Sequence, residues 1–74
     1  MSSLPSISGA QAIRAFERLG YKVDHQRGSH IVLRQVQAPH RRLVVPNHRS
    51  VAKGTLRALI REAGLTVEQF REAL

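Results

Sequence analysis

The sequence predicts an α+β fold in which two longer helices pack on one face of a three-stranded antiparallel sheet. Three observations support this. Apolar residues recur at helical spacing near both ends of the chain, residues in the middle alternate as strand residues do, and glycines or prolines separate these segments. The expected order is helix, three strands, helix and a short final helix. Because the chain has only 74 residues, we expect one domain over residues 1–74 with one modest core.

The first helix is expected over residues Ser8–Gly20. Ser8 and Gln11 match a capping box, in which each side chain accepts a hydrogen bond from the backbone amide of the other residue. Three apolar residues then recur at helical spacing: Ala12, Phe16 and Leu19. Gly20 is typical of the residue that ends a helix.

Residues 21–26 are predicted to form the first strand, because they alternate with the period of a half-buried strand. On one side of this strand we expect Tyr21, Val23 and His25. On the other side we expect Lys22, Asp24 and Gln26. Gly28 and Ser29 then supply a turn. A four-residue connection at this turn would instead place His25 opposite His30, so a pair of imidazoles is an open alternative.

The second strand is expected over residues 30–36, which are rich in β-branched and aliphatic side chains. Its two faces are expected to be His30 with Val32, and Ile31 with Leu33. The stretch of residues 37–40 breaks the strand, and residues 41–45 form a third strand that Pro46 ends.

The second helix is expected over Lys53–Ala63, with Gly64 placed to terminate it. Its apolar stripe consists of Leu56, Leu59, Ile60 and Ala63. Residues 50–52 are either its first turn or a lead-in. A short last helix follows, with Thr66 as N-cap, Gln69 completing a capping box and Leu65 stapled against Phe70.

Composition limits the classes of function. Twelve Lys and Arg against five Asp and Glu give a formal charge of +7, which favours a polyanionic partner such as nucleic acid. A basic surface that only maintains solubility, or one neutralised by an acidic protein, is the alternative. The chain has no cysteine, which excludes disulfides, thiolate nucleophiles and cysteine-ligated zinc and fits a reducing cytoplasm. No membrane span or secretory signal is expected.

His30 is the first candidate for chemistry, because it directly follows the Gly28–Ser29 turn and so presents an imidazole beside a loop. The ordinary pKa of imidazole, about 6.5, allows this group to accept and donate protons near neutrality. A lone strand histidine is more often structural or solvated, so its position alone is weak evidence. His48 follows the third strand and could point toward the same region, although it is also interpretable as a loop histidine.

A zinc or copper site built from the histidines is a weaker hypothesis. Only Asp24 lies near the hairpin to add a carboxylate, and no two histidines have the i, i+4 spacing that converges on one helical face. We therefore expect no metal and no cofactor. His40 is expected to be merely exposed.

Four cations recur at four-residue spacing and form a basic stripe wherever this segment is helical: Arg49, Lys53, Arg57 and Arg61. A row of one sign repels itself, so we interpret it as a track for RNA phosphates rather than as an ordinary solvated face. Three more arginines extend the charge along the sheet and its loops: Arg27, Arg41 and Arg42. No aromatic ladder accompanies them, so base stacking is not expected to dominate.

Together these motifs resemble the HicA toxin family from Ser8 to Phe70. The pieces are Ser8-Gly9, Leu19-Gly20-Tyr21, Gly28-Ser29-His30, Val45-Pro46-Asn47-His48, Lys53-Gly54-Thr55-Leu56 and Ala63-Gly64-Leu65. Each piece is common, but their order and spacing together are fairly specific. Two features depart from the family pattern: Ile31 follows the motif histidine, and the connection over residues 35–42 looks variable, so a substrate preference cannot be carried over.

The resemblance implies a fold like that of double-stranded-RNA-binding domains, with which the predicted element order is compatible. It implies a toxin of a bacterial toxin–antitoxin pair that cleaves messenger RNA in the cytoplasm as a metal-independent endoribonuclease, with His30 as catalytic residue and with a HicB-type antitoxin as protein partner. Ser29 and His48 are possible accessory residues, and Arg27 joins the cations of the second helix as RNA-binding. The alternative is a non-catalytic module that binds structured RNA through its shape and phosphates.

Overall fold

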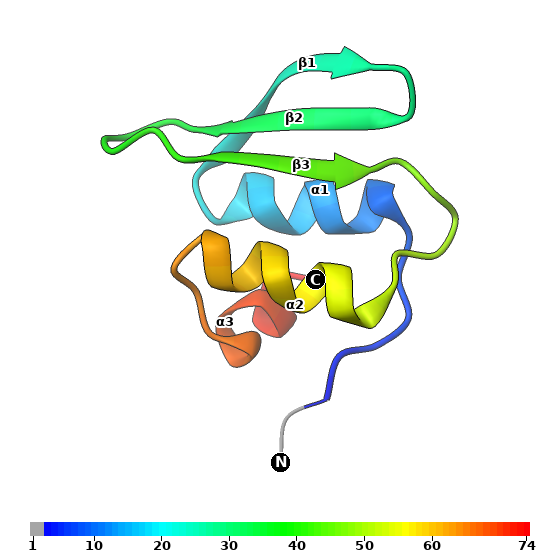
Figure 1. The fold of residues 1–74 in the computed structure, drawn as a ribbon. Helices are drawn as coiled ribbons and strands as arrows, with labels where there is room; N and C mark the ends of the chain where they lie inside the picture. The colour runs from blue at the N-terminus through cyan, green and yellow to red at the C-terminus, as the bar shows by residue number, and fades with distance from the viewer. Residues whose placement is uncertain (1–2) are drawn as a thin grey trace.

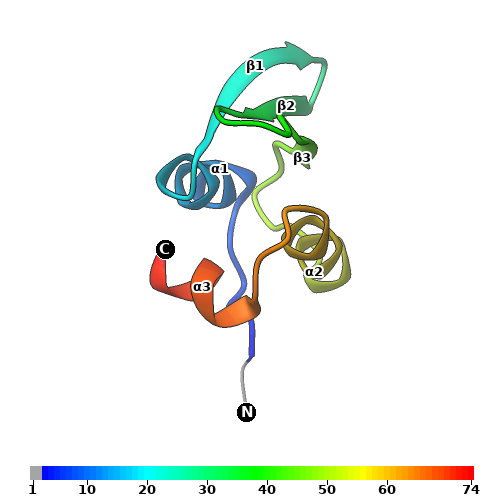
Figure 2. The same cartoon turned by 90° about the vertical axis from the view of Figure 1, so that its left-hand side faces the viewer.

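The computed structural model describes residues 3–74 and has the predicted α+β order (Figure 1). Its elements are α1 (Gly9–Arg18), β1 (Tyr21–Arg27), β2 (His30–Gln35), β3 (Arg42–Pro46), α2 (Lys53–Glu62) and α3 (Val67–Glu72). The strands form one antiparallel sheet in the order β1-β2-β3. Both α1 and α2 lie on the same face of this sheet, and α3 packs against the two helices on the side away from the sheet (Figure 2).

The core lies between the inner face of the sheet and the three helices. Its largest fully buried side chains are Leu4, Phe16, Leu33, Leu43, Val45, Leu56 and Phe70. The ring of Phe16 is central to the core. Its centroid lies 5.9 Å from the ring centroid of Tyr21 and 5.0 Å from that of Phe70. Leu65 is partly buried against the same cluster, which includes Phe70. The core therefore covers one face of the sheet and leaves the other uncovered by any helix.

Helix capping follows the predicted motifs in α1 and α3. The Ser8 hydroxyl accepts a hydrogen bond from the backbone amide of Gln11, and the Gln11 side chain accepts one from the backbone amide of Ser8. Thr66 and Gln69 make the same reciprocal pair. No side chain caps α2, whose N-cap residue is Ala52. Residues 50–52 are consequently a lead-in to α2 and not its first turn.

The first strand differs from the prediction at a β-bulge. The register with β2 shifts between Val23 and His25, so Asp24 has no partner in the pairing. Val23 pairs with Leu33, whereas His25 pairs with Val32, the next residue back along β2. One extra residue in a strand reverses which face the following side chains occupy. The expectation that His25 shares a side with Tyr21 and Val23 is therefore wrong.

The burial pattern of β1 also corrects the prediction. Of its residues only Tyr21 is buried, and Val23 is 45% exposed. As an edge strand, β1 extends beyond the area that the helices cover, so its alternation does not produce a half-buried strand.

Strand ends differ slightly from those predicted. β2 stops at Gln35, β3 starts at Arg42, and Pro46 is the last residue of β3 rather than the first beyond it. An edge strand tolerates a terminal proline because one side of its backbone needs no ladder partner. Within residues 3–74 no helix combines the length and the apolar character that crossing a membrane requires.

Candidate active site

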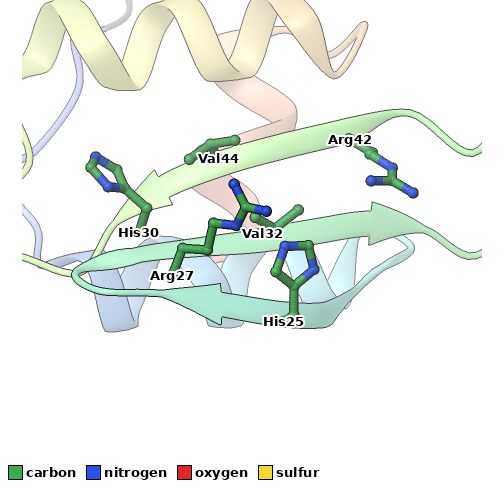
Figure 3. A pocket seen from close by; sticks show the side chains of 6 residues that line it. All are labelled: His25, Arg27, His30, Val32, Arg42 and Val44. Atoms are coloured by element: carbon green, nitrogen blue, oxygen red, sulfur yellow. The ribbon is translucent and has the colours of Figure 1, made fainter.

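The uncovered face of the sheet, which we call the outer face, carries an open depression of about 550 Å³. Each strand contributes two side chains to its lining: His25 and Arg27 from β1, His30 and Val32 from β2, and Arg42 and Val44 from β3 (Figure 3). The depression thus combines two imidazoles, two guanidinium groups and two apolar side chains.

Strand alternation explains this composition. Side chains at every second position of a strand point to the same face, which brings His30 and Val32 together with Arg42 and Val44. β1 joins them only after its bulge, which turns His25 and Arg27 outward. Arg27 is the direct cross-strand partner of His30.

His30 lies at the start of the central strand and is exposed. It pairs with Arg27 on one side and with Pro46 on the other, so its backbone is held between both neighbouring strands. The turn before it contains only Gly28 and Ser29, and Gly28 adopts a φ of 54° that suits glycine in a tight hairpin turn. The four-residue connection that would place His25 opposite His30 is therefore absent from this hairpin.

His25 is held by its neighbour Asp24. Its Nδ1 lies 2.9 Å from Oδ2 of Asp24, and the side chains are 44% and 34% exposed. The hydrogen bond from His25 is the main cause that lowers the pKa of Asp24, and the nearby charges of His25, Arg42 and Arg34 lower it further, while desolvation opposes them. Asp24 is therefore an ionised acceptor at neutral pH.

The floor of the depression is apolar. Val32 is only 8% exposed although it faces away from the core, whereas Val44 is 48% exposed beside it. Figure 3 shows His25 and Arg27 reaching from β1 toward Val32, with His30 at the rim next to Val44. A flat apolar group can therefore rest on the valines while charged groups at the rim contact an anion.

The loop after β3 is tied to the hairpin turn. The Asn47 amide donates a hydrogen bond to the Ser29 carbonyl at 2.6 Å, and the Gly9 amide donates one to the His48 carbonyl at 2.8 Å. Ser29 and His48 are both exposed, and neither lines the depression. The structure therefore places this loop beside the turn but does not bring the His48 side chain into the same pocket as His30.

The cations of the second helix are on another part of the surface. Lys53, Arg57 and Arg61 are exposed on α2, which lies on the opposite face of the sheet from the depression. Arg49 is exposed in the loop before α2, so the predicted row is helical only from Lys53 onward. Arg57 and Arg61 border a separate shallow depression near the start of α3. The N-terminal end of α2 is at the same end of the molecule as the Gly28–Ser29 turn, so the row begins near that turn and leads away from it (Figure 1).

Arg42 and Val44 were not predicted to belong to the site, and His25 was expected near His30 only through a four-residue connection, whereas the bulge brings it there. Alternation along residues 42–46 could have identified Arg42 and Val44, because Leu43 and Val45 are the apolar set of that strand. No sequence signal marks the bulge at Asp24. In the part of the chain that the structure describes, no three His, Cys, Asp or Glu side chains gather as a metal site would require.

Comparison with known families decides the class of protein. A family model described as the HicA toxin of bacterial toxin–antitoxin systems matches residues 9–65. The chain belongs to the HicA toxin family. The match includes the hairpin turn and all six residues of the depression, and it ends before α3. A search of curated proteins gave no match.

Family membership makes this HicA protein the toxin of a bacterial toxin–antitoxin system, and it implies a cognate antitoxin as partner. The resemblance inferred from the Gly28-Ser29-His30 turn and the motifs around it is thereby confirmed. The family match itself names no substrate and no reaction.

Proposed function

We propose that this HicA protein is a metal-independent endoribonuclease that cleaves messenger RNA in the bacterial cytoplasm, with His30 as the catalytic residue. The observation that supports this most directly is the depression on the outer face, which combines an exposed imidazole with the guanidinium groups of Arg27 and Arg42. An open surface of this kind suits a polymeric substrate, whose chain must enter and leave.

Such a site does not have to supply a nucleophile, because the 2′-hydroxyl of the RNA is the nucleophile. The reaction needs a group that removes the 2′-proton or protonates the departing 5′-oxygen, and donors that stabilise charge on the phosphate. His30 can transfer the proton, and Arg27, its cross-strand partner, can bind the phosphate. The expected products are a 2′,3′-cyclic phosphate and a free 5′-hydroxyl.

The wider basic surface is proposed to hold the rest of the RNA. Arg49, Lys53, Arg57 and Arg61 would bind phosphates that leave the depression around the loop after β3, with Ser29 and His48 as accessory contacts beside the turn. Contacts of this type carry affinity rather than sequence specificity.

His30→Ala tests this proposal. An exposed side chain contributes little to packing, so the variant should retain a native-like melting curve and bind RNA while losing cleavage, because alanine transfers no proton. The measurement is cleavage of a labelled transcript by both purified proteins with a chelator present. Undiminished cleavage by the folded variant would remove His30 from the mechanism. RNA binding without cleavage by the wild-type protein would favour a non-catalytic RNA-binding module.

We also propose that the cognate HicB-type antitoxin inhibits by covering the depression. A surface with this excess of positive charge suits a partner that presents carboxylates. Hydrogen exchange on the complex should protect backbone amides of β1 and β2 around the Gly28–Ser29 turn. Protection restricted to α1 and α3 would show that inhibition does not work by occlusion.

A further inference from the structure

The two imidazoles of the outer face lie on opposite sides of one guanidinium group. Arg27 pairs directly with His30, and His25 pairs with Val32, so the two histidines are diagonal neighbours across β1 and β2. The Cα atoms of diagonal neighbours in an antiparallel pair of strands are about 7–8 Å apart. Figure 3 shows the Arg27 side chain between them, and all three side chains line the same depression. A single phosphodiester group bound to Arg27 would lie within reach of both rings.

The hydrogen bond with Asp24 prepares His25 for proton transfer. An ionised carboxylate can only accept, so the Nδ1 of His25, 2.9 Å from Oδ2, must carry the hydrogen. This leaves Nε2 as the atom that can exchange a proton with a ligand. A carboxylate that fixes the tautomer and orientation of an imidazole is a known way of supporting an acid–base histidine. Asp24 is available for this role because it is the extra residue of the bulge and has no partner in the pairing with β2.

We propose that His25 is a second catalytic residue of this site, and that the scissile phosphodiester binds at Arg27 between His25 and His30. Asp24 is then a positioning residue that acts through His25. The proposal rests on the ribonuclease function proposed above and adds a second proton-transfer group to it.

The proposed cleavage requires one imidazole to be neutral and the other to be protonated. The neutral ring removes the proton of the 2′-hydroxyl as the 2′-oxygen forms a bond to phosphorus. The bond from phosphorus to the 5′-oxygen breaks, and the protonated ring gives its proton to that oxygen. The products are a 2′,3′-cyclic phosphate and a 5′-hydroxyl, and the two rings have exchanged protonation states, which proton exchange with water restores.

The charges around His25 are mostly positive. Asp24 is its hydrogen-bond partner, and the register places several cations with it on the outer face of the three strands. The titratable and charged groups concerned are Asp24, Lys22 and Arg27 on β1, His30 and Arg34 on β2, and Arg42 on β3. Such a surface attracts a phosphodiester and holds it close to both imidazoles.

The test compares His25→Gln with His40→Gln. Both residues are exposed, and His40 lies before β3, away from the depression. With a labelled RNA oligonucleotide, the wild-type rate should depend on pH as a bell, because one ring must be neutral while the other is protonated. His25→Gln should lower the rate by about 10²- to 10⁴-fold and abolish one limb of the bell, the loss expected when a general acid or base is removed. His40→Gln should change neither the rate nor the profile.

Two further measurements test the assignment of roles. An oligonucleotide with sulfur in place of the bridging 5′-oxygen has a leaving group that needs no proton, so it should restore cleavage to one of His25→Gln and His30→Gln and not to the other. Asp24→Asn should lower kcat with little change in KM, and Asp24→Glu, which retains the carboxylate, should lower it less. If the sulfur-containing oligonucleotide restores cleavage to neither histidine variant, the proposal that His25 and His30 act as an acid–base pair is wrong.

The outcomes separate this inference from the ribonuclease function. Absence of cleavage by the wild-type protein would defeat the proposed function itself. Cleavage that requires His30 but persists at the wild-type rate in folded His25→Gln would defeat only the role of His25. A reduced rate with both limbs of the bell intact would show that His25 is structural, which also overturns the inference.

Discussion

At the scale of single residues, Tyr21 shows what a buried polar group does in a small core. Its side chain is 3% exposed, and its hydroxyl has no hydrogen-bond partner among residues 3–74. Burial raises the pKa of Tyr21 above its ordinary value of 10.0, while the charge of Arg41 opposes this. A buried hydroxyl without a partner loses its hydrogen bonds to water and gains none in return. Its aromatic ring, packed edge-on against Phe16, is what stabilises the core.

Tyr21→Phe should therefore be neutral or stabilising by about 1 kcal/mol, because it removes the unpaired hydroxyl and keeps the ring. A pKa that is higher in the folded state favours folding below the pKa of unfolded tyrosine, and this contribution is lost as the pH rises through the folded value. Melting of both proteins from pH 8 to about pH 11 should show the wild-type protein losing stability faster above about pH 10. A clear drop in stability of the variant at pH 8 would indicate that the hydroxyl has a partner.

At the scale of elements, the position of the hairpin and the following loop depends on how closely β3 approaches α1. A Cβ atom placed on Gly9 would overlap the carbonyl oxygen of Pro46 and lie 2.9 Å from Cα of Asn47. Only glycine permits this approach, and it is also the approach that brings the Gly9 amide to the His48 carbonyl. The backbone of Asn47 in turn holds the turn that precedes His30. The packing of one helix start thus fixes the geometry of the site.

Gly9→Ala should destabilise the protein by about 1–3 kcal/mol, because its methyl group meets backbone atoms that cannot move away as a flexible side chain would. Gly54→Ala is a matched control near the start of α2, where no atom lies within 4 Å of the position that the alanine methyl group would occupy. That substitution should be neutral or stabilising by about 0.5–1 kcal/mol through helix propensity. Chemical denaturation of both variants gives the comparison, and equal stabilities would mean that β3 and α1 separate at little cost.

At the scale of the whole molecule, positive charge is distributed over two surfaces that the sheet separates. The outer face holds Arg27 and Arg42 in the depression, and α2 carries the row from Lys53 to Arg61 on the other side. The row spans about 12 Å, at 1.5 Å per helical residue. An RNA that contacts both surfaces has to pass around an edge of the sheet, and the row on α2 begins at the end of the molecule where β3 leads into α2 (Figure 1).

If RNA follows this path, its affinity should fall steeply with salt, because each neutralised phosphate releases a counterion. The double variant Lys53→Gln, Arg57→Gln should reduce the log-log slope by about 0.7 for each lost contact with single-stranded RNA. Arg14→Gln, which removes an exposed arginine of α1, serves as the control and should leave the slope unchanged. The measurement is a salt titration of binding to the uncleaved RNA, made with His30→Ala as background. An unchanged slope in the double variant would confine binding to the outer face.

Local pattern in the sequence determined the elements of this protein. Capping boxes at Ser8 and Thr66 depend on residues three positions apart, and helical or strand alternation depends on nearest neighbours, so the order and approximate ends of the elements were predictable. The turn that presents His30 was predictable for the same reason, since Gly28 suits its backbone conformation.

Only the tertiary structure decided which side chains share the site. The bulge at Asp24 is a property of the pairing between β1 and β2, and it moves His25 to the outer face against the alternation of its own strand. The extent of the helices decided that Val23 and Val44 stay exposed, because burial depends on what covers a sheet and not on the strand itself. The cations of α2 matched a row in the sequence, but the packing of α2 beneath the sheet placed that row away from the depression. These outcomes depend on contacts between residues far apart in the chain, which no local pattern records.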